Sequence, residues 1–188
     1  MSTDLEIPAA PVQRILAAAR FAAEKHAGQK RKGDAAEPYI NHLIEVAELI
    51  AASSAVLDVN LVMAGFLHDS VEDVGVTAAE LEETFGPDVT SLVLEVTDDK
   101  SLPKEARKAL QVKSAPKKSP RAQTLKLADK ISNLRAILAS PPRDWSTQRK
   151  REYFEWARDV IAGLQSPNRK LKEEFDRTYA RFDEKPEQ

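Results

Sequence analysis

Residues 61–67 (LVMAGFL) are apolar on every face of a helix, and this run constrains the fold more than any other segment. A helix without a polar face must lie inside the protein, surrounded by other elements. Asp58 stands where the N-cap of such a helix is expected. Along the rest of the chain apolar residues recur at helical spacing, and no segment keeps a strict alternation of apolar and polar residues. The sequence therefore predicts an all-α fold with a compact single domain.

The helical pattern extends over most of the 188 residues, a length that fits one domain better than two. We expect a helical domain over residues 11–182, with flexible polar tails at 1–10 and 183–188. Apolar spacing and capping residues place the other helices at about 11–27, 39–50, 77–85, 88–97, 121–139, 146–164 and 167–182. The run 92–96 (LVLEV) also fits a β-strand.

The composition excludes several classes of site. The chain has no cysteine, which rules out disulfides, iron–sulfur clusters, thiolate zinc sites and cysteine nucleophiles. A transition-metal site must therefore use carboxylates and the three histidines of the chain, His26, His42 and His68. No apolar run is long enough to span a bilayer, and the N-terminus does not resemble a secretion signal, so we expect a cytoplasmic protein.

The formal net charge of −2 argues against general binding to nucleic acid or to membrane surfaces. The charge is unevenly distributed, however. Residues 98–121 hold eight basic and three acidic residues, a net charge of +5, and the rest of the chain carries −7. This segment is either a solvated loop with a surface helix or a lid that attracts a polyanion such as a phosphorylated nucleotide.

Four ionisable residues crowd positions 68–73 (HDSVED), next to the most apolar segment of the chain. Their spacing places His68 with Glu72, and Asp69 with Asp73, on common helical faces. Burying such a cluster is costly unless a cation neutralises it, whereas at an exposed helix end these residues are ordinary.

Further metal ligands would have to come from other elements. His42 opens a helix, and it is either a ligand, a cap or a core residue. Asp129 lies within a helix among apolar residues, where a carboxylate needs a partner: a metal ion, or one of the lysines Lys126 and Lys130. Two imidazoles and two carboxylates form a possible set: His42, His68, Asp69 and Asp129. Such nitrogen and oxygen ligands suit Mn²⁺, Fe²⁺ or Zn²⁺.

Six segments carry a pattern that is specific as a set, although a His-Asp pair alone is not. They are HAGQKRKGDAAEPYINH (26–42), AGFLHDSVEDVGVT (64–77), FGPDV (85–89), VTDDKSLPKEARKALQ (96–111), KLADKISNLR (126–135) and EYFEWARDVIAGLQSPNR (152–169). With these segments the chain resembles HD-domain metal hydrolases, and in particular the hydrolase domain of RelA/SpoT-type alarmone enzymes. The resemblance covers residues 12–182 and is closest to the small stand-alone alarmone hydrolases of the metazoan SpoT-homologue type.

The resemblance implies hydrolysis of the 3′-diphosphate of guanosine tetra- or pentaphosphate (ppGpp or pppGpp), which releases pyrophosphate and GDP or GTP. It implies one bound Mn²⁺, for which Zn²⁺ or Fe²⁺ could stand in, with four ligands: His42, His68, Asp69 and Asp129. It makes Glu72 and Asp73 the catalytic pair that acts on the attacking water. It implies substrate binding by six further residues: Arg31, Lys32, Lys104, Asn133, Arg149 and Tyr153.

Most of these residues also have a purely structural interpretation. Tyr153 would fit a core position with its hydroxyl at the rim, and Lys104 would fit a solvent-facing lysine. The two neighbouring carboxylates of Glu72 and Asp73 cannot both ionise freely, so one can move a proton while the other orients the water. His26 is expected to be structural, hydrogen-bonded to a backbone carbonyl.

The sequence also permits other functions. The same basic residues would suit another phosphorylated nucleotide, including the 2′-phosphate of NADPH, which members of this type are said to accept. A nucleotide sensor without turnover would lack a ligand or the Glu-Asp pair, and a protein–protein module would not need the charge cluster. The loop 33–37 is longer than in bifunctional alarmone enzymes, and a chain of this length is expected only to degrade. We expect a small guanine nucleotide as partner, neither nucleic acid nor membrane, and predict no oligomeric state.

Overall fold

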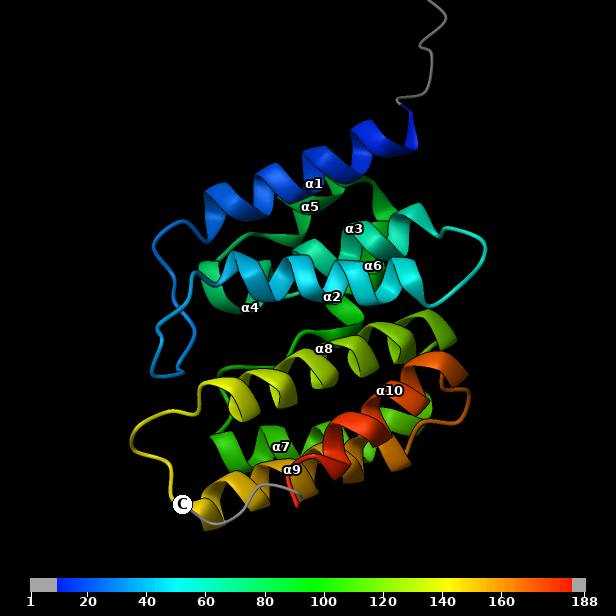
Figure 1. Cartoon of the computed structure of the whole chain (residues 1–188). Coiled ribbons are helices and arrows are strands. Elements are labelled where there is room, and N and C mark those ends of the chain that lie inside the picture. The colour runs from blue at the N-terminus through cyan, green and yellow to red at the C-terminus, as the bar shows by residue number, and fades with distance from the viewer. Residues whose placement is uncertain (1–9, 184–188) are drawn as a thin grey trace, which may run out of the picture.

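The computed structural model describes residues 10–183, which form helices joined by loops (Figure 1). The helices of these residues are α1 (Pro11–Lys25), α2 (Ile40–Ala52), α3 (Val59–Leu67), α4 (Ser70–Val74), α5 (Ala78–Phe85), α6 (Pro87–Val96), α7 (Lys104–Ser114), the 3₁₀ turn η1 (Ala115–Lys117), α8 (Pro120–Ala139), α9 (Thr147–Ala162) and α10 (Arg169–Ala180). The β-type pairing in this part of the chain is a single bridge between Lys30 and Pro38. The predicted all-α fold is confirmed. None of the described helices combines the length and the apolar character needed to cross a bilayer.

α3 packs against α1, α2 and α6 in the interior of the first half of the fold (Figure 1). All residues from Leu61 to Leu67 are buried, as their uniformly apolar sequence predicts. Asp58 caps the helix, because its side chain accepts a hydrogen bond from the backbone N–H of Leu61 at 3.0 Å. The buried helix delivers His68, the residue that follows it, into the interior of the protein.

α2 and α3 approach each other closely because residue 65 has no side chain. A Cβ atom added at Gly65 would lie 3.0 Å from Ile50 Cδ1 and 3.1 Å from Ala47 Cα. Both distances are shorter than an optimal contact between carbon atoms. Gly65 therefore sets the spacing between the helix that carries His42 and the helix that ends before His68.

α8 is the longest of the described helices and lies between the two halves of the fold (Figure 1). It contacts α2, α3 and α6 on one side and α9 and α10 on the other. Every residue from Leu125 to Ser132 is buried, including the charged residues Lys126, Asp129 and Lys130. Charged groups in such a position need partners, so the middle of α8 is a place where a functional site is expected.

The loop between α1 and α2 folds back on itself as a short hairpin. Tyr39 N donates to Gln29 O at 2.9 Å and closes the hairpin at its base. The tip lies against the C-terminal end of α8, where a Cβ atom on Gly33 would come within 2.3 Å of Ser140 O. This close approach, which requires glycine, holds the basic residue Arg31 beside α8.

Two elements differ from the predictions. α3 ends at Leu67, and His68 and Asp69 form a turn before the separate short helix α4, so 68–73 is not one continuous helix. Asp73 N nevertheless donates to Asp69 O at 2.8 Å, which keeps these two residues at helical spacing. The run 92–96 lies in α6, so the strand alternative is wrong. The tails predicted at 1–10 and 183–188 lie outside the described residues, apart from residues 10 and 183.

Candidate metal centre and active site

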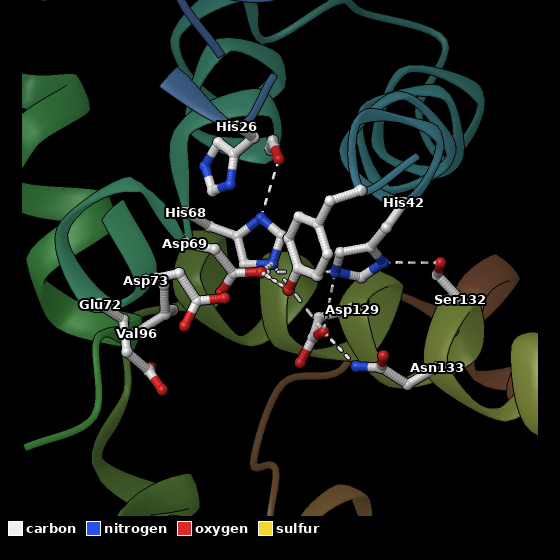
Figure 2. Close-up of polar contacts among 12 residues, drawn as sticks. His26, His42, His68, Asp69, Glu72, Asp73, Val96, Asp129, Ser132 and Asn133 are labelled. Atoms are coloured by element: carbon white, nitrogen blue, oxygen red, sulfur yellow. Dashed lines mark hydrogen bonds and ion pairs between the residues drawn. The ribbon is translucent and has the colours of Figure 1, made fainter. Parts of the chain in front are cut away.

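Two histidines and two aspartates from three parts of the fold meet in the interior (Figure 2). His42 comes from α2, His68 and Asp69 from the turn between α3 and α4, and Asp129 from α8. His42, His68 and Asp69 offer ligand atoms that lie within 4.8 Å of one another. Asp129 Oδ1 lies 3.6 Å from His42 Nε2 and 3.9 Å from His68 Nε2. Three of the residues predicted as ligands thus form one compact group, and the fourth, Asp129, faces both imidazoles of that group.

Hydrogen bonds to the two imidazoles determine which nitrogen faces the aspartates. His68 Nδ1 donates to Gly65 O at 2.9 Å, because a carbonyl oxygen only accepts. Ser132 Oγ donates its single proton to Glu45 Oε2 at 2.6 Å, so it accepts from His42 Nδ1 at 2.8 Å. Both rings therefore turn Nε2 toward the aspartates, with the proton of Nδ1 bound elsewhere. Histidine ligands of metal ions are held in this way.

The two carboxylates are also held by neighbouring side chains. Asp69 Oδ2 accepts a hydrogen bond from the Tyr39 hydroxyl at 2.6 Å. Burial, followed by the charge of Asp69, raises the pKa of Tyr39 above its usual range, so the phenol stays protonated and donates. Asp129 Oδ2 accepts from Lys130 Nζ at 3.0 Å, and Asp129 Oδ1 accepts from Asn133 Nδ2 at 2.6 Å.

The charges of this cluster keep both aspartates ionised. Burial alone would raise the pKa of Asp69, but the positive charge of His68 holds it well below its usual range. Burial would likewise raise the pKa of Asp129, but Lys130 and His68 hold it below its usual range. Burial lowers the pKa of His42. Burial also opposes the protonation of His68, yet Asp69 and Asp129 raise its pKa to about 9. The imidazolium of His68 thus neutralises part of the buried negative charge.

These residues fit a divalent cation. His68 Nε2 is buried and makes no hydrogen bond, although Asp69 Oδ2 lies 3.1 Å away. A cation would take the place of the proton on this nitrogen and would neutralise the buried carboxylates more fully. Imidazole nitrogen and carboxylate oxygen are ligands that Mn²⁺, Fe²⁺ and Zn²⁺ accept.

Glu72 lies on α4 at the edge of this cluster, on the same side as Asp69 (Figure 2). Its Oε2 accepts a hydrogen bond from Asp98 N at 3.2 Å, and its Oε1 lies 3.5 Å from Arg107 Nη1. Burial raises the pKa of the Glu72 carboxyl, and the Asp98 hydrogen bond opposes this effect. A carboxyl with a raised pKa takes up a proton closer to neutral pH than an exposed glutamate does.

Asp73 follows Glu72 on α4 and has its own hydrogen-bond partners, although Lys100 Nζ also lies 3.9 Å from Glu72 Oε1. Its Oδ1 accepts from Lys100 Nζ at 2.5 Å, and its Oδ2 accepts from Gln29 Nε2 at 2.8 Å. The two neighbouring carboxylates therefore differ in environment: Glu72 is partly buried and accepts from a backbone N–H, and Asp73 is bound by an ammonium and an amide.

Basic residues of the hairpin, α7 and α9 lie near one another, and one of them, Arg31, contacts the cluster through Asn133. Arg31 Nη2 donates to Asn133 Oδ1 at 2.9 Å, and Asn133 in turn contacts Asp129. Burial lowers the pKa of Lys104, and the charges of Arg149, Lys108 and Lys32 lower it further. The positive charges of the hairpin, α7 and α9 therefore lie near one another, in a place where an anion would relieve their repulsion.

Tyr153 could be a core residue or a substrate-binding residue on the basis of the sequence, and its surroundings are compatible with both. Its ring packs between Trp145 and Trp156, with ring centres 5.5 Å and 5.2 Å away. Burial raises the pKa of its hydroxyl, and the charge of Lys130 opposes this. The Arg149 guanidinium lies 4.7 Å from the centre of the Trp145 ring. Tyr153 is thus a packed residue that is electrostatically coupled to the site.

Sequence reasoning missed two residues that hold the predicted ligands: Tyr39 and Ser132. Their only signal was proximity in the sequence to His42 or Asp129. Lys130 was weighed as an alternative to a metal ion, whereas it binds one oxygen of Asp129 and leaves the other facing the histidines. Lys126 instead donates to Val96 O at 3.2 Å.

The predicted hydrogen-bond partner of His26 is wrong. The ring is buried, as expected, but its Nδ1 lies 2.6 Å from the side-chain oxygen of Gln29, not from a backbone carbonyl. A side-chain partner across a helix end leaves no pattern in the sequence, because it depends on how the chain turns after α1.

The fold and the His/Asp cluster are those of an HD-domain protein, and residues 18–164 match the family described as HD domain, to which the chain therefore belongs. Within that family it is 50% identical over 160 residues to the human guanosine-3′,5′-bis(diphosphate) 3′-pyrophosphohydrolase MESH1, an alignment of 85% of this chain and 89% of that protein. The protein of the same name from Xenopus tropicalis is 47% identical over 165 residues, or 88% of this chain and 92% of the relative.

A solved structure agrees with this relationship. It is that of a metazoan ortholog of SpoT described as hydrolysing ppGpp and playing a role in starvation responses. It superimposes with a TM-score of 0.86 at 40% identity and covers 93% of this chain and 97% of its own. The family resemblance predicted from the sequence motifs is confirmed.

Proposed function

We propose that this chain is a metal-dependent hydrolase that removes the 3′-diphosphate of guanosine tetra- or pentaphosphate and releases pyrophosphate with GDP or GTP. The observation that carries the proposal is the convergence of two imidazoles and two carboxylates beside a group of basic side chains. Relatives that align over most of the chain bear the name of this activity. A sensor without turnover would have no use for the polar Glu72–Asp73 pair beside the cluster.

His42, His68, Asp69 and Asp129 would hold one divalent ion, and we propose Mn²⁺ because half of the ligands are carboxylates and none is a thiolate. When bound, such a cation lowers the pKa of a bound water and polarises a phosphoryl oxygen. Tyr39 and Lys130 keep one oxygen of each aspartate oriented, and Ser132 keeps His42 in the required tautomer.

Glu72 and Asp73 would act on the attacking water. Glu72, whose pKa is raised by burial, is suited to take the proton of the water and to hold it. Asp73 is fixed by Lys100 and Gln29 and is suited to orient the water by accepting a hydrogen bond. General base catalysis of this kind contributes about 10²- to 10⁴-fold to a rate.

The basic residues would bind the substrate. Lys32, Lys104 and Arg149 would present clustered positive charge to its phosphates, since the charges of Arg149 and Lys32 disfavour that of Lys104, and an anion would offset this repulsion. Arg31 offers a planar guanidinium that can bind a phosphate or stack on the purine, and it is held by Asn133. Tyr153 and Asn133 would contact the ribose and the 3′ side of the nucleotide.

The test is to incubate the Mn²⁺-loaded protein with guanosine tetraphosphate and to measure released pyrophosphate and GDP. A parallel sample with NADPH measures release of inorganic phosphate, and the two kcat/KM values decide between the substrates. We expect turnover of guanosine tetraphosphate that is lost in Asp69→Ala. Intact guanosine tetraphosphate in the presence of Mn²⁺ would overturn the proposal, and a higher kcat/KM for NADPH would replace its substrate.

A further inference from the structure

His26 and Gln29 lie beside the site, but neither belongs to the residues proposed above to hold metal or substrate. His26 is 2% exposed and is the residue at which α1 ends. Its ring lies on the side of His68 that is remote from Asp129 (Figure 2). His26 Nδ1 lies 2.6 Å from Gln29 Oε1, and Gln29 Nε2 donates to Asp73 Oδ2 at 2.8 Å. Two hydrogen bonds therefore join a buried imidazole to a carboxylate of the candidate active site.

The direction of these hydrogen bonds follows from the chemistry of the groups. Asp73 also binds the Lys100 ammonium at 2.5 Å, as a carboxylate that only accepts hydrogen bonds does. The Gln29 group that faces Asp73 is therefore the amide nitrogen, and its oxygen faces His26. His26 Nδ1 must then carry the proton. His26 Nε2 is buried and has no hydrogen-bond partner among the described residues, so the bond to Gln29 is the sole polar contact of this ring.

A second contact keeps the His26 ring in place. The ring stacks on Tyr39 with 5.3 Å between ring centres and 15° between ring planes. Tyr39 N also binds Gln29 O, which ties the backbone of Gln29 to the same tyrosine. Stacking on Tyr39 thus holds the His26 ring, and the hydrogen bond from Tyr39 N holds the backbone of Gln29. The side-chain amide of Gln29, which lies between these two fixed groups, can therefore move little.

We propose that His26 and Gln29 are positioning residues that hold the Asp73 carboxylate in the orientation needed for hydrolysis. This inference rests on the proposed function. Without the amide, Asp73 would keep Lys100 as its side-chain partner, and Lys100 is 48% exposed. The carboxylate would then follow a mobile ammonium toward solvent. A displacement of about 1 Å at a reacting group is enough to lower a rate about 10²-fold.

The first experiment compares kcat, KM and bound metal in three variants of the Mn²⁺-loaded protein. Gln29→Met removes the amide, and His26→Phe keeps a stacking ring but removes the donor. His26→Asn has a shorter side chain that can still donate a hydrogen bond to Gln29. We expect the first two to lower kcat about 10- to 100-fold with unchanged KM and metal content, and His26→Asn to recover part of the loss. Gln13→Met, on the exposed face of α1, is the matched control and should keep the wild-type kcat.

The second experiment tests whether Gln29 acts through Asp73. In the Asp73→Asn background, Gln29→Met should cause no further loss of kcat, since the residue that it positions is already altered. Losses that multiply would overturn the inference, as would a wild-type kcat in both Gln29→Met and His26→Phe. If either single variant unfolds, the other single variant carries the comparison.

A third measurement does not depend on turnover. The chain has three histidines, so ¹⁵N NMR with His26→Asn as an assignment aid identifies the His26 ring. We expect the Nδ1–H tautomer in the wild type and its loss in Gln29→Met. An Nε2–H tautomer in the wild type would overturn the inference. If guanosine tetraphosphate is not hydrolysed at all, the proposed function fails while this measurement still decides the hydrogen-bond chain.

Discussion

His42 and Glu45, one turn apart on α2, are joined through the hydroxyl of Ser132 on α8. The other oxygen of Glu45 binds Arg135 Nη1 at 2.9 Å, and Arg135 Nη2 binds Glu174 on α10 at 2.5 Å. The orientation of one candidate metal ligand is therefore fixed by a polar network that includes α2, α8 and α10. This network, rather than His42 alone, determines how Nε2 is presented.

Ser132→Ala should weaken metal binding. The substitution removes the acceptor of His42 Nδ1 and leaves the ring free to rotate or to change tautomer. We expect the affinity for Mn²⁺ to fall about 10- to 100-fold, as is usual when the outer partner of a ligating histidine is lost. Calorimetric titration of the metal-free protein measures the affinity. Ser54→Ala, on an exposed loop, is the control, and an unchanged affinity in Ser132→Ala would contradict the role of the network.

Removal of the metal should lower the melting temperature. The carboxylates of Asp69 and Asp129 are buried, and without a divalent ion their charge is offset by neighbouring groups, chiefly His68 and Lys130. A ligand at 100 times its Kd stabilises a protein by about 2.7 kcal/mol, which corresponds to roughly 5 to 10 °C for a domain of this size. Thermal unfolding with Mn²⁺ and with chelator measures the shift. The melting temperature of Asp69→Ala should not respond to Mn²⁺; an equal response in both proteins would place the ion elsewhere.

Glu72→Gln should separate catalysis from metal binding. The amide keeps the shape of the side chain and the contact with Asp98 N, but it cannot take a proton from water. We expect kcat to fall about 10²- to 10⁴-fold, with KM and metal content close to wild type. Steady-state kinetics and metal analysis of the same preparation provide the measurement. Glu155→Gln, at an exposed position of α9, serves as the control. Retention of the wild-type kcat in Glu72→Gln would remove Glu72 from the mechanism.

Asp88→Asn should destabilise the protein only above acidic pH. Arg121 binds Asp88 and Asp58 at 2.8 Å each, and its hydrogen bonds hold the pKa of Asp88 below the ordinary value. Such a group stabilises the fold fully above its unfolded pKa of about 3.9, and the contribution is lost as pH falls through the folded pKa. Because Asp88 is half exposed, we expect a loss of about 0.5 kcal/mol in the free energy of unfolding near neutral pH.

Urea unfolding of wild type and Asp88→Asn, both in chelator, measures this difference across a pH series. The difference should shrink below pH ~4 and disappear toward pH ~2, since both proteins are then uncharged at this position. Added salt should reduce it near neutral pH because the pair is exposed. A difference that is independent of pH would assign the effect to packing and not to charge.

The sequence predicts the helices of this fold well because capping and apolar spacing are local signals. Asp58 caps α3 as predicted, and Thr77 caps α5 at the start of the predicted helix 77–85, with Thr77 Oγ1 accepting from Glu80 N at 3.1 Å. The end of α3 at Leu67 was not predicted. The helix stops there, and His68 and Asp69 form a turn that brings their side chains to the site. The motif 68–73 (HDSVED) contains neither glycine nor proline, so the sequence gives no signal for this break.

The composition narrows the candidate ligands, with three histidines and no cysteine, and the family resemblance points to the four named above. The side chains that hold these ligands could not all be predicted. Tyr39 and Ser132 contact Asp69 and His42 from other elements, and these contacts depend on how the helices pack. Lys130 directly follows Asp129 on α8, and its pairing with Asp129 is one of the alternatives that the sequence offers. The assignment of Lys32, Lys104 and Arg149 to the substrate stays a prediction, supported by the nearness of their charges.

Gly65 links packing and chemistry at a single position. Its missing side chain lets α2 and α3 touch, and its carbonyl oxygen receives the proton of His68 Nδ1. A methyl group there would push one imidazole away from the other while it strained the core. A side chain at this residue would change the packing of the core and the position of His68 together. Stability and activity therefore cannot be altered separately by a substitution at Gly65.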